Sequence, residues 1–349
     1  MSIRDNIHVN TIEKILKFSK HKRFFTGREL SEFLGISRQA VNKHLKGVIQ
    51  SGKIVKQGTT KGALYNLTTA TRTQQFSRKV KKTFFLSGLE EDKVFREFAQ
   101  FLNLKSELSK NSFDISYYAF TEILNNAIDH SESEMCSIEI ILDRYKLNFT
   151  IRDFGIGIFH SIFSKLQLPD ENSAIGELIK GKITTMKEKH TGEGIFFTSK
   201  AADNMIFRSH KINMIFDNQK KDIFVEEKKY IEGTGVFFSI SRQTKKLLYK
   251  IFAQYAPEEF DYTFERTRAL VKLFHKNYVS RSEAKRLLYG LDKFKEVILD
   301  FKGVTSIGQG FADEIFRVFA NEHPDIKIKT ANVSPALQPV INHVIDKNN

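Results

Sequence analysis

Hydrophobic residues recur at helical spacing through the first fifty positions of the chain, with two breaks that carry helix-ending and helix-starting residues. Thr26 followed by Glu29 is typical of a capping box, which predicts the start of a second helix that stops at Gly35. Ser37 predicts the N-cap of a third helix that ends near Gly52. The β-branched residues that follow flank a glycine-containing basic segment, and this pattern predicts a β-hairpin.

The middle of the chain predicts a helix followed by two strands. Apolar residues between positions 90 and 112 recur at helical spacing. Residues 138–142 and 147–151 predict strands joined by a turn, so Asp153 lies at a strand end. A polar, lysine-containing stretch then separates Gly157 from Thr191.

The last quarter of the chain alternates short helices and strands, which is typical of a small α/β layer fold. Its predicted elements are a helix opened by Ser282, a strand at 297–301, a helix after Gly308, a strand at 326–329 and a helix capped by Ser334-Pro335. The whole pattern predicts a multidomain protein. Its expected parts are a first domain at 1–70, a basic linker at 71–85, a central domain at 86–255 and a C-terminal domain at 256–349.

Positive charge is concentrated at the start of the chain. Residues 1–85 contain 18 Lys and Arg against 4 Asp and Glu, while the net charge of all 349 residues is +14, so residues 86–349 sum to zero. Such a basic segment indicates a part that faces nucleic acid or a membrane surface. The lack of a long apolar run or a signal-peptide core favours a cytoplasmic, bacterial-like protein without a membrane partner. The single cysteine, Cys136, excludes a disulfide framework and a cysteine-based zinc cluster.

The order helix, turn, helix, hairpin resembles the winged helix-turn-helix family, and the segment from Glu29 to Leu45 is similar to its second and recognition helices. Outward residues suited to groove edges and phosphates are Ser37, Arg38, Gln39, Asn42, Lys43 and Lys46. Lys56 and Lys61 on the wing suit backbone contacts. The expected partner is double-stranded DNA, bound by a homodimer because paired half-sites multiply specificity. A winged helix that binds protein is the alternative.

Three short segments combine into a predicted nucleotide site. In the first, Glu122 and Asn126 are one helical turn apart, so a carboxylate suited to activating water lies beside an oxygen ligand for Mg²⁺. The second, Asp153-Phe-Gly-Ile-Gly157, offers an acceptor and close backbone approach to a planar base. The third, Thr191-Gly-Glu-Gly-Ile195, opens a helix with N–H groups for phosphates. Together these chemistries fit ATP.

These segments resemble the N, G1 and G2 boxes of the GHKL superfamily of gyrase, Hsp90, histidine kinase and MutL-type ATP-binding domains, which also includes anti-sigma-factor serine kinases. The resemblance covers roughly residues 86–245 and implies an α/β sandwich that binds ATP and Mg²⁺. It implies Glu122 as general base, Asn126 as the Mg²⁺ ligand and Asp153 as the acceptor for the adenine amino group. The implied ATP-binding residues are Asn126, Asp129, Asp153, Gly155, Gly157, Thr191, Gly192, Glu193, Gly194 and Thr234. The polar stretch before Thr191 corresponds to the ATP lid, whose closure would shield the phosphates from water.

Two residues that related proteins use as phosphate acceptors are absent from this chain at the corresponding places. Residues 76–121 contain no histidine, although a histidine kinase carries its phosphoacceptor on a helix there, so a two-component sensor kinase is not expected. Residues 297–314 resemble the central strand and turn of STAS domains, the anti-anti-sigma-factor fold. Those factors carry a phosphorylatable serine at the turn, where this chain has Gly308-Gln309-Gly310, with Ser306 just upstream. We therefore interpret this STAS-like domain as a sensing module or a docking site for a protein partner.

Together these features predict an ATP-binding transcription regulator. ATP binding would reposition or pair the winged helices, and slow hydrolysis with Glu122 as base would reset them. Three alternatives remain open: an anti-sigma-type serine/threonine protein kinase, a DNA-stimulated processing or defence ATPase, and a scaffold with an inert nucleotide site. The sequence leaves open whether ATP is hydrolysed, transferred to a protein or only bound.

Overall fold

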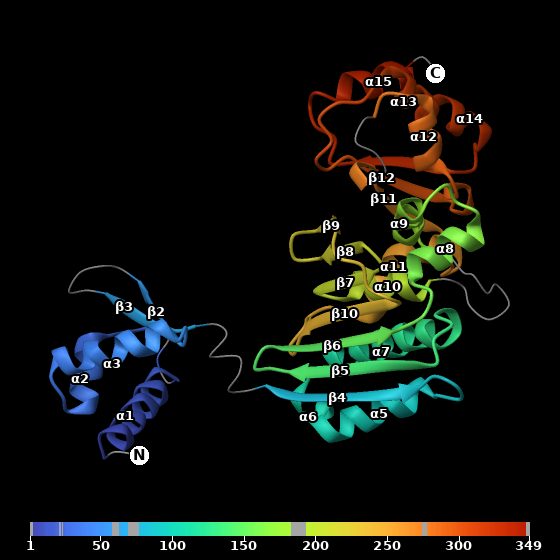
Figure 1. The fold of residues 1–349 in the computed structure, drawn as a ribbon. Coiled ribbons are helices and arrows are strands. Elements are labelled where there is room, and N and C mark those ends of the chain that lie inside the picture. The colour runs from blue at the N-terminus through green and yellow to red at the C-terminus, as the bar shows by residue number, and fades with distance from the viewer. Residues whose placement is uncertain are drawn as a thin grey trace. The chain divides into compact units, whose positions relative to one another are not determined.

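A computed structural model describes residues 3–20, 22, 24–57, 63–68, 77–182, 193–273 and 278–346, without the side chains of 3–10, 57 and 346. The chain divides into two compact units, one built mainly of residues 1–78 and the other of residues 79–349. Figure 1 labels the elements of each. Within these described ranges, no helix has the length and apolar character needed to cross a membrane.

The first unit combines three helices with a small sheet. Its elements are α1 (Ile3–Lys20), β1 (Phe25–Thr26), α2 (Gly27–Leu34), α3 (Arg38–Gln50), β2 (Ile54–Gln57) and β3 (Leu64–Leu67), with sheet order β1-β3-β2. Thr26 and Glu29 form the predicted capping box. Gly35 ends α2 in the left-handed conformation, with φ of 65°. The Ser37 hydroxyl accepts the Ala40 N–H at the start of α3. The predicted caps and the antiparallel hairpin are therefore confirmed.

The core of the first unit contains most of the predicted apolar positions. Leu30, Val41, Leu45 and Val48 are all buried. Phe33, an apolar residue of α2, is instead 53% exposed and its ring packs beside Phe18, with 4.7 Å between centroids. Helical period alone does not distinguish a core position from one at the border of the apolar face.

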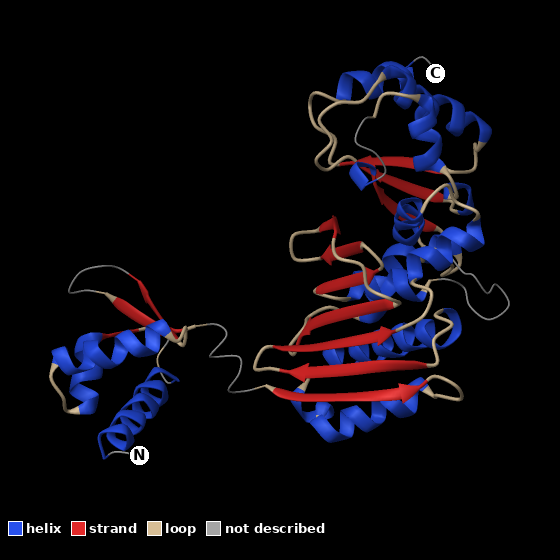
Figure 2. Ribbon diagram, viewed as in Figure 1, coloured by secondary structure: helices blue, strands red, loops and turns tan. Residues whose placement is uncertain are grey.

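A seven-stranded sheet forms the centre of the second unit (Figure 2). Its strands, in sheet order, are β4 (Arg78–Phe85), β5 (Met135–Leu142), β6 (Lys146–Asp153), β10 (Thr234–Ser241), β7 (Asn204–Ser209), β8 (Ile212–Asp217) and β9 (Asp222–Glu227). The pairs from β6 to β9 are antiparallel. Along β5 and β6, buried residues alternate with more exposed ones, so one face of the sheet carries the core.

The prediction of a basic linker at 71–85 is wrong for the second half of that range, because Arg78–Phe85 form the edge strand β4. Its basic side chains led us to expect a connector. Lysines are common on edge strands, where their charge discourages pairing with another chain.

Helices cover the core face of the sheet and fill the segment expected to be a polar lid. They are α5 (Glu91–Leu102), α6 (Leu104–Glu107), α7 (Lys110–His130), α8 (Ile158–Leu166), α9 (Glu171–Lys180), α10 (Gly194–Ala201) and α11 (Leu248–Tyr255). Helix α7 packs on β6 and β10. The first half of the expected polar stretch is instead two helices, because α8 and α9 bury apolar side chains such as Ile162 and Ile179, and its role as a lid stays a prediction. The rest of that stretch, residues 183–192, lies outside the described residues.

The C-terminal part is the predicted α/β layer. Parallel strands β11 (Arg266–Leu270), β12 (Glu296–Asp300) and β13 (Lys327–Ala331) pair in that order. The helices are α12 (Arg281–Leu288), α13 (Gln309–Asp313), a π-helical turn at Glu314–Phe319, α14 (Ala320–Glu322) and α15 (Gln338–Asp346), with single 3-10 turns at Glu258–Phe260, Val271–Leu273 and Leu291–Lys293. Two predicted helix starts are wrong: Ser280 caps α12 in place of Ser282, and α15 begins at Gln338, after Pro335.

Candidate functional site

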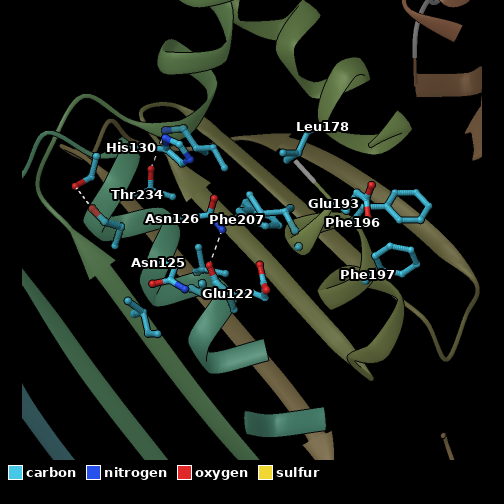
Figure 3. A pocket seen from close by; sticks show the side chains of 18 of the residues that line it. Glu122, Asn125, Asn126, His130, Leu178, Glu193, Phe196, Phe197, Phe207 and Thr234 are labelled. Atoms are coloured by element: carbon cyan, nitrogen blue, oxygen red, sulfur yellow. Dashed lines mark hydrogen bonds between the residues drawn. The ribbon is translucent and has the colours of Figure 1, made fainter. Parts of the chain in front are cut away.

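A cavity of about 350 Å³ lies between helix α7, the end of strand β6 and the start of helix α10. Figure 3 shows Glu122 and Asn126 on α7, with Glu193 and Phe196 at the start of α10. Its polar lining residues include Glu122, Asn125, Asn126, His130, Ser131, Asp153, Ser161, Glu193 and Thr234. Its apolar walls include Ile123, Ile151, Ile158, Ile162, Leu178, Phe207 and Val236. The volume is within the range of about 300–1,000 Å³ that is usual for small-molecule sites.

Asp153 ends strand β6 and is held rigidly in the cavity wall. Its side chain is 6% exposed, and its Oδ1 accepts the backbone N–H groups of Thr234 at 3.0 Å and Gly155 at 3.1 Å. Burial raises the pKa of Asp153, and these two hydrogen bonds act in the opposite direction. The Thr234 hydroxyl accepts the Ile158 N–H at 2.8 Å, which ties the start of α8 to the same point. The arrangement fixes one carboxylate oxygen and thereby orients the other.

The turn after Asp153 packs closely against the end of helix α7. A Cβ atom on Gly155 would lie 1.7 Å from the carbonyl oxygen of Ser131, and that oxygen accepts the Ile156 N–H at 2.8 Å. Gly157 has φ of 82°, a conformation that other residues rarely adopt. These two predicted glycines are not among the lining residues. Gly155 lets the turn that carries Asp153 approach α7, whereas Gly157 lies against the side chains of Ser209 and His210.

Glu122 and Asn126 line the cavity from one face of helix α7. The Asn126 Nδ2 donates to the Glu122 carbonyl oxygen at 2.5 Å. The Glu122 carboxylate lies against Gly194, where a Cβ atom would be 1.7 Å from Oε2. Burial, then the charges of Glu122 and Glu193, raise the pKa of Tyr118 one turn earlier. Burial also raises the pKa of Glu193. This end of the cavity is therefore acidic and partly desolvated.

Six of the predicted nucleotide residues line one cavity: Glu122, Asn126, Asp153, Glu193, Gly194 and Thr234. Asp129 lies on the same helix but is not among the lining residues. Thr191 and Gly192 lie outside the described residues.

Sequence reasoning missed several lining residues, including Tyr118, Asn125 and Ser161. The Ser161 hydroxyl is buried and has no hydrogen-bond partner within the part of the chain that the structure describes. The apolar spacing of Ile158, Phe159 and Ile162 was the available signal, since it predicts a helix that would turn Ser161 inward.

Lys200, in the last turn of α10, is not among the cavity residues. Its Nζ is 4.8 Å from the centroid of the Phe196 ring and 5.8 Å from that of Tyr255. Burial and then the positive charge of Arg268 lower the pKa of Lys200 to about 8. Its neighbour Ser199 donates to the Phe196 carbonyl oxygen.

The first unit presents a basic helix face. All six residues predicted on or beside α3 are exposed, namely Ser37, Arg38, Gln39, Asn42, Lys43 and Lys46, and Lys56 on β2 is exposed as well. The opposite side of α3 is buried through Val41, Leu45 and Val48. Among the residues with described side chains, no acidic group pairs with Arg38, Lys43 or Lys46. Lys61 lies outside the described residues.

Comparisons with protein families match the two ends of the chain. Residues 11–59 match the model of an HTH domain, and residues 283–338 match a STAS-like domain of unknown function (DUF4325). A search of curated proteins gave no match. Neither family match reaches the cavity residues, which lie between Tyr118 and Phe252. The chain therefore contains an HTH domain, which suggests a DNA-binding regulator, and a STAS-like domain.

Proposed function

We propose that this protein is an ATP-responsive, DNA-binding regulator in which a GHKL-type nucleotide site controls the HTH domain. The observation that carries the proposal is the convergence of Glu122, Asn126 and Asp153 on one cavity in a chain that also has an HTH domain. Site and DNA reader belong to one polypeptide, so ATP can act on DNA affinity if it binds the DNA-competent and DNA-incompetent states differently.

The base-binding end of the cavity has the chemistry that adenine requires. Asp153 is a fixed acceptor for the exocyclic amino group, because its Oδ1 is already held by two backbone N–H groups. Aliphatic side chains such as Ile151, Ile162 and Val236 provide flat apolar contact for the ring. The buried Ser161 hydroxyl would gain a partner from a ligand atom, and buried polar groups usually have one.

The acidic end of the cavity suits phosphates only together with a cation. Two carboxylates, Glu122 and Glu193, would repel a polyphosphate, whereas Mg²⁺ prefers oxygen ligands. Asn126 uses its amide nitrogen in the bond to Glu122, which leaves the amide oxygen as the ligand. Bound Mg²⁺ would supply charge neutralisation. Glu122 would hold and deprotonate the attacking water, and the N–H groups at the start of α10 would bind phosphate.

Two copies of the HTH domain would read DNA together. One recognition helix offers few base contacts, so a homodimer on paired half-sites is the arrangement that we propose for a specific regulator. In this arrangement ATP would change the distance or orientation of the two α3 helices. DNA affinity would then depend on the nucleotide through geometry, without any direct contact between ATP and DNA.

An anti-sigma-type protein kinase is the second candidate, because residues 283–338 match a STAS-like domain and the STAS fold is that of the anti-anti-sigma factors, which carry a phosphorylatable serine. The fate of γ-labelled phosphate distinguishes the two. We expect slow release to water with no label on protein, and Glu122→Gln should keep ATP affinity while it slows release about 100-fold, as loss of a general base does. Glu139→Gln, on β5 outside the cavity lining, is the matched control. Label transferred to protein would favour the kinase, and unchanged release in Glu122→Gln would remove the assigned base.

A further inference from the structure

The cavity and the C-terminal layer share a wall. Phe196 and Phe197 of helix α10 line the cavity, and both belong to the same buried cluster as Val297 and Leu299 of strand β12. Helix α9, whose Leu178 also lines the cavity, packs on strand β11, as Figure 1 shows. Movement of the C-terminal layer would therefore move side chains that form the cavity.

Phe264, in the loop before β11, joins two parts of this wall. Its side chain is 3% exposed, and its ring centroid lies 4.5 Å from that of Phe196 and 5.1 Å from that of Phe197. A Cβ atom on Gly181 would lie 2.8 Å from Phe264 and 2.9 Å from Phe196. Gly181, itself a lining residue, has φ of 79°, so this junction accepts only glycine. One aromatic ring thus contacts the wall residues that follow α9 and those that begin α10.

Polar contacts also join the end of α9 to the C-terminal layer. The buried Thr267 hydroxyl of β11 donates to the Lys180 carbonyl oxygen at 2.6 Å. The Lys180 Nζ, 1% exposed, donates to Glu177 at 2.7 Å and to the Tyr289 carbonyl oxygen at 2.5 Å. Burial lowers the pKa of Lys180, and Glu177 opposes that shift.

Lys182 adds a second polar attachment on the other side of Gly181. Its Nζ donates to Glu265 at 2.9 Å and to the Lys293 carbonyl oxygen at 2.8 Å. Gly181 is therefore flanked by two lysines that are both bonded to the C-terminal layer. A buried charge that loses a partner is costly, so these bonds favour one position of the layer relative to α9.

We propose that the C-terminal layer sets the affinity of the nucleotide site for ATP. Thr267 and Phe264 are positioning residues that act through Lys180, Gly181 and Phe196. This inference rests on the proposed function and names the regulation of that same site. Linkage makes the effect reciprocal: a partner that shifts the layer changes ATP affinity, and ATP changes the affinity for that partner by the same factor. The layer thus acts on the site through its wall without contacting the nucleotide.

The test uses the full-length protein and the isosteric change Thr267→Val, which removes the hydroxyl and with it the hydrogen bond to the Lys180 carbonyl oxygen. We expect ATP affinity to fall by about 5-fold or more, the low end of measured couplings between sites. Phe264→Leu, which loosens the ring contacts, should act in the same direction. Thr267→Ser keeps a hydroxyl and should restore wild-type affinity. Without nucleotide, amide hydrogen exchange at residues 177–182 should be faster in Thr267→Val than in the wild type.

Ile315→Val is the control for general weakening of the layer, since Ile315 is buried in the same cluster on the π-helical turn. It should lower thermal stability and leave ATP affinity within about 2-fold, below typical coupling. ATP affinity that is unchanged in Thr267→Val, or that falls equally in Ile315→Val, would overturn this inference and leave the proposed function standing. A wild-type protein that does not bind ATP would overturn the proposed function, and the inference with it.

Discussion

Asp153→Asn is expected to raise the Kd for ATP by about 100-fold or more, because a site built to hydrogen-bond one group strongly rejects a mismatch. The asparagine oxygen can still accept the N–H groups of Thr234 and Gly155, so the turn keeps its structure. Its NH₂ group would then face the amino group of adenine, so that two donors meet in a buried place. Isothermal titration with Mg²⁺·ATP measures the loss, and circular dichroism checks that the fold is intact.

Asp203→Asn is the matched control for this prediction. Asp203 is also a buried aspartate beside the same sheet, where it accepts the Ser241 N–H at 2.7 Å and pairs with Lys246. It is not among the cavity residues, so its substitution should cost stability without a comparable loss of ATP affinity. Wild-type affinity in Asp153→Asn would remove this residue from the adenine site.

Arg38→Ala combined with Lys43→Ala is expected to weaken binding to duplex DNA by about 30-fold or more at low salt, since a lost base contact removes about 1–3 kcal/mol and a lost phosphate contact weakens binding to all sequences. Both side chains are exposed on α3, opposite its buried face. Where both neutralise phosphates, the slope of log K against log salt should fall in magnitude by about 2. Fluorescence anisotropy over a salt series measures both quantities.

Lys14→Ala with Lys17→Ala removes the same charge from the same unit and is the control. Both lysines are exposed on α1, and neither is on the predicted recognition helix. This pair should reduce DNA affinity far less than the α3 pair. Equal losses from the two double variants would show that total charge, and not the α3 face, determines binding.

Local signals in the sequence were sufficient for the helix caps and the strand ends. Thr26, Glu29 and Ser37 define helix starts through bonds within three residues, and the alternation before Asp153 defines the end of β6. These features depend on neighbours along the chain, so a pattern of a few residues can predict them. Each of the three nucleotide motifs is also a short pattern of neighbouring residues, and most of their described residues line one cavity.

Features that depend on distant packing were not predicted. The basic segment from Arg78 became an edge strand because β5 was available to pair with it. The shared wall at Phe196 and Phe264 joins residues far apart in the chain, and no periodicity reports such a contact.

The most direct test of the account is the affinity of the full-length protein for duplex DNA with and without Mg²⁺·ATP, measured on the wild type and on Asp153→Asn. We predict that ATP changes the wild-type Kd for DNA by about 5-fold or more, as coupled sites typically do, and leaves that of Asp153→Asn unchanged. A wild-type protein that binds ATP, yet binds DNA with the same affinity in its presence and absence, would contradict the proposed control of the HTH domain by the nucleotide site.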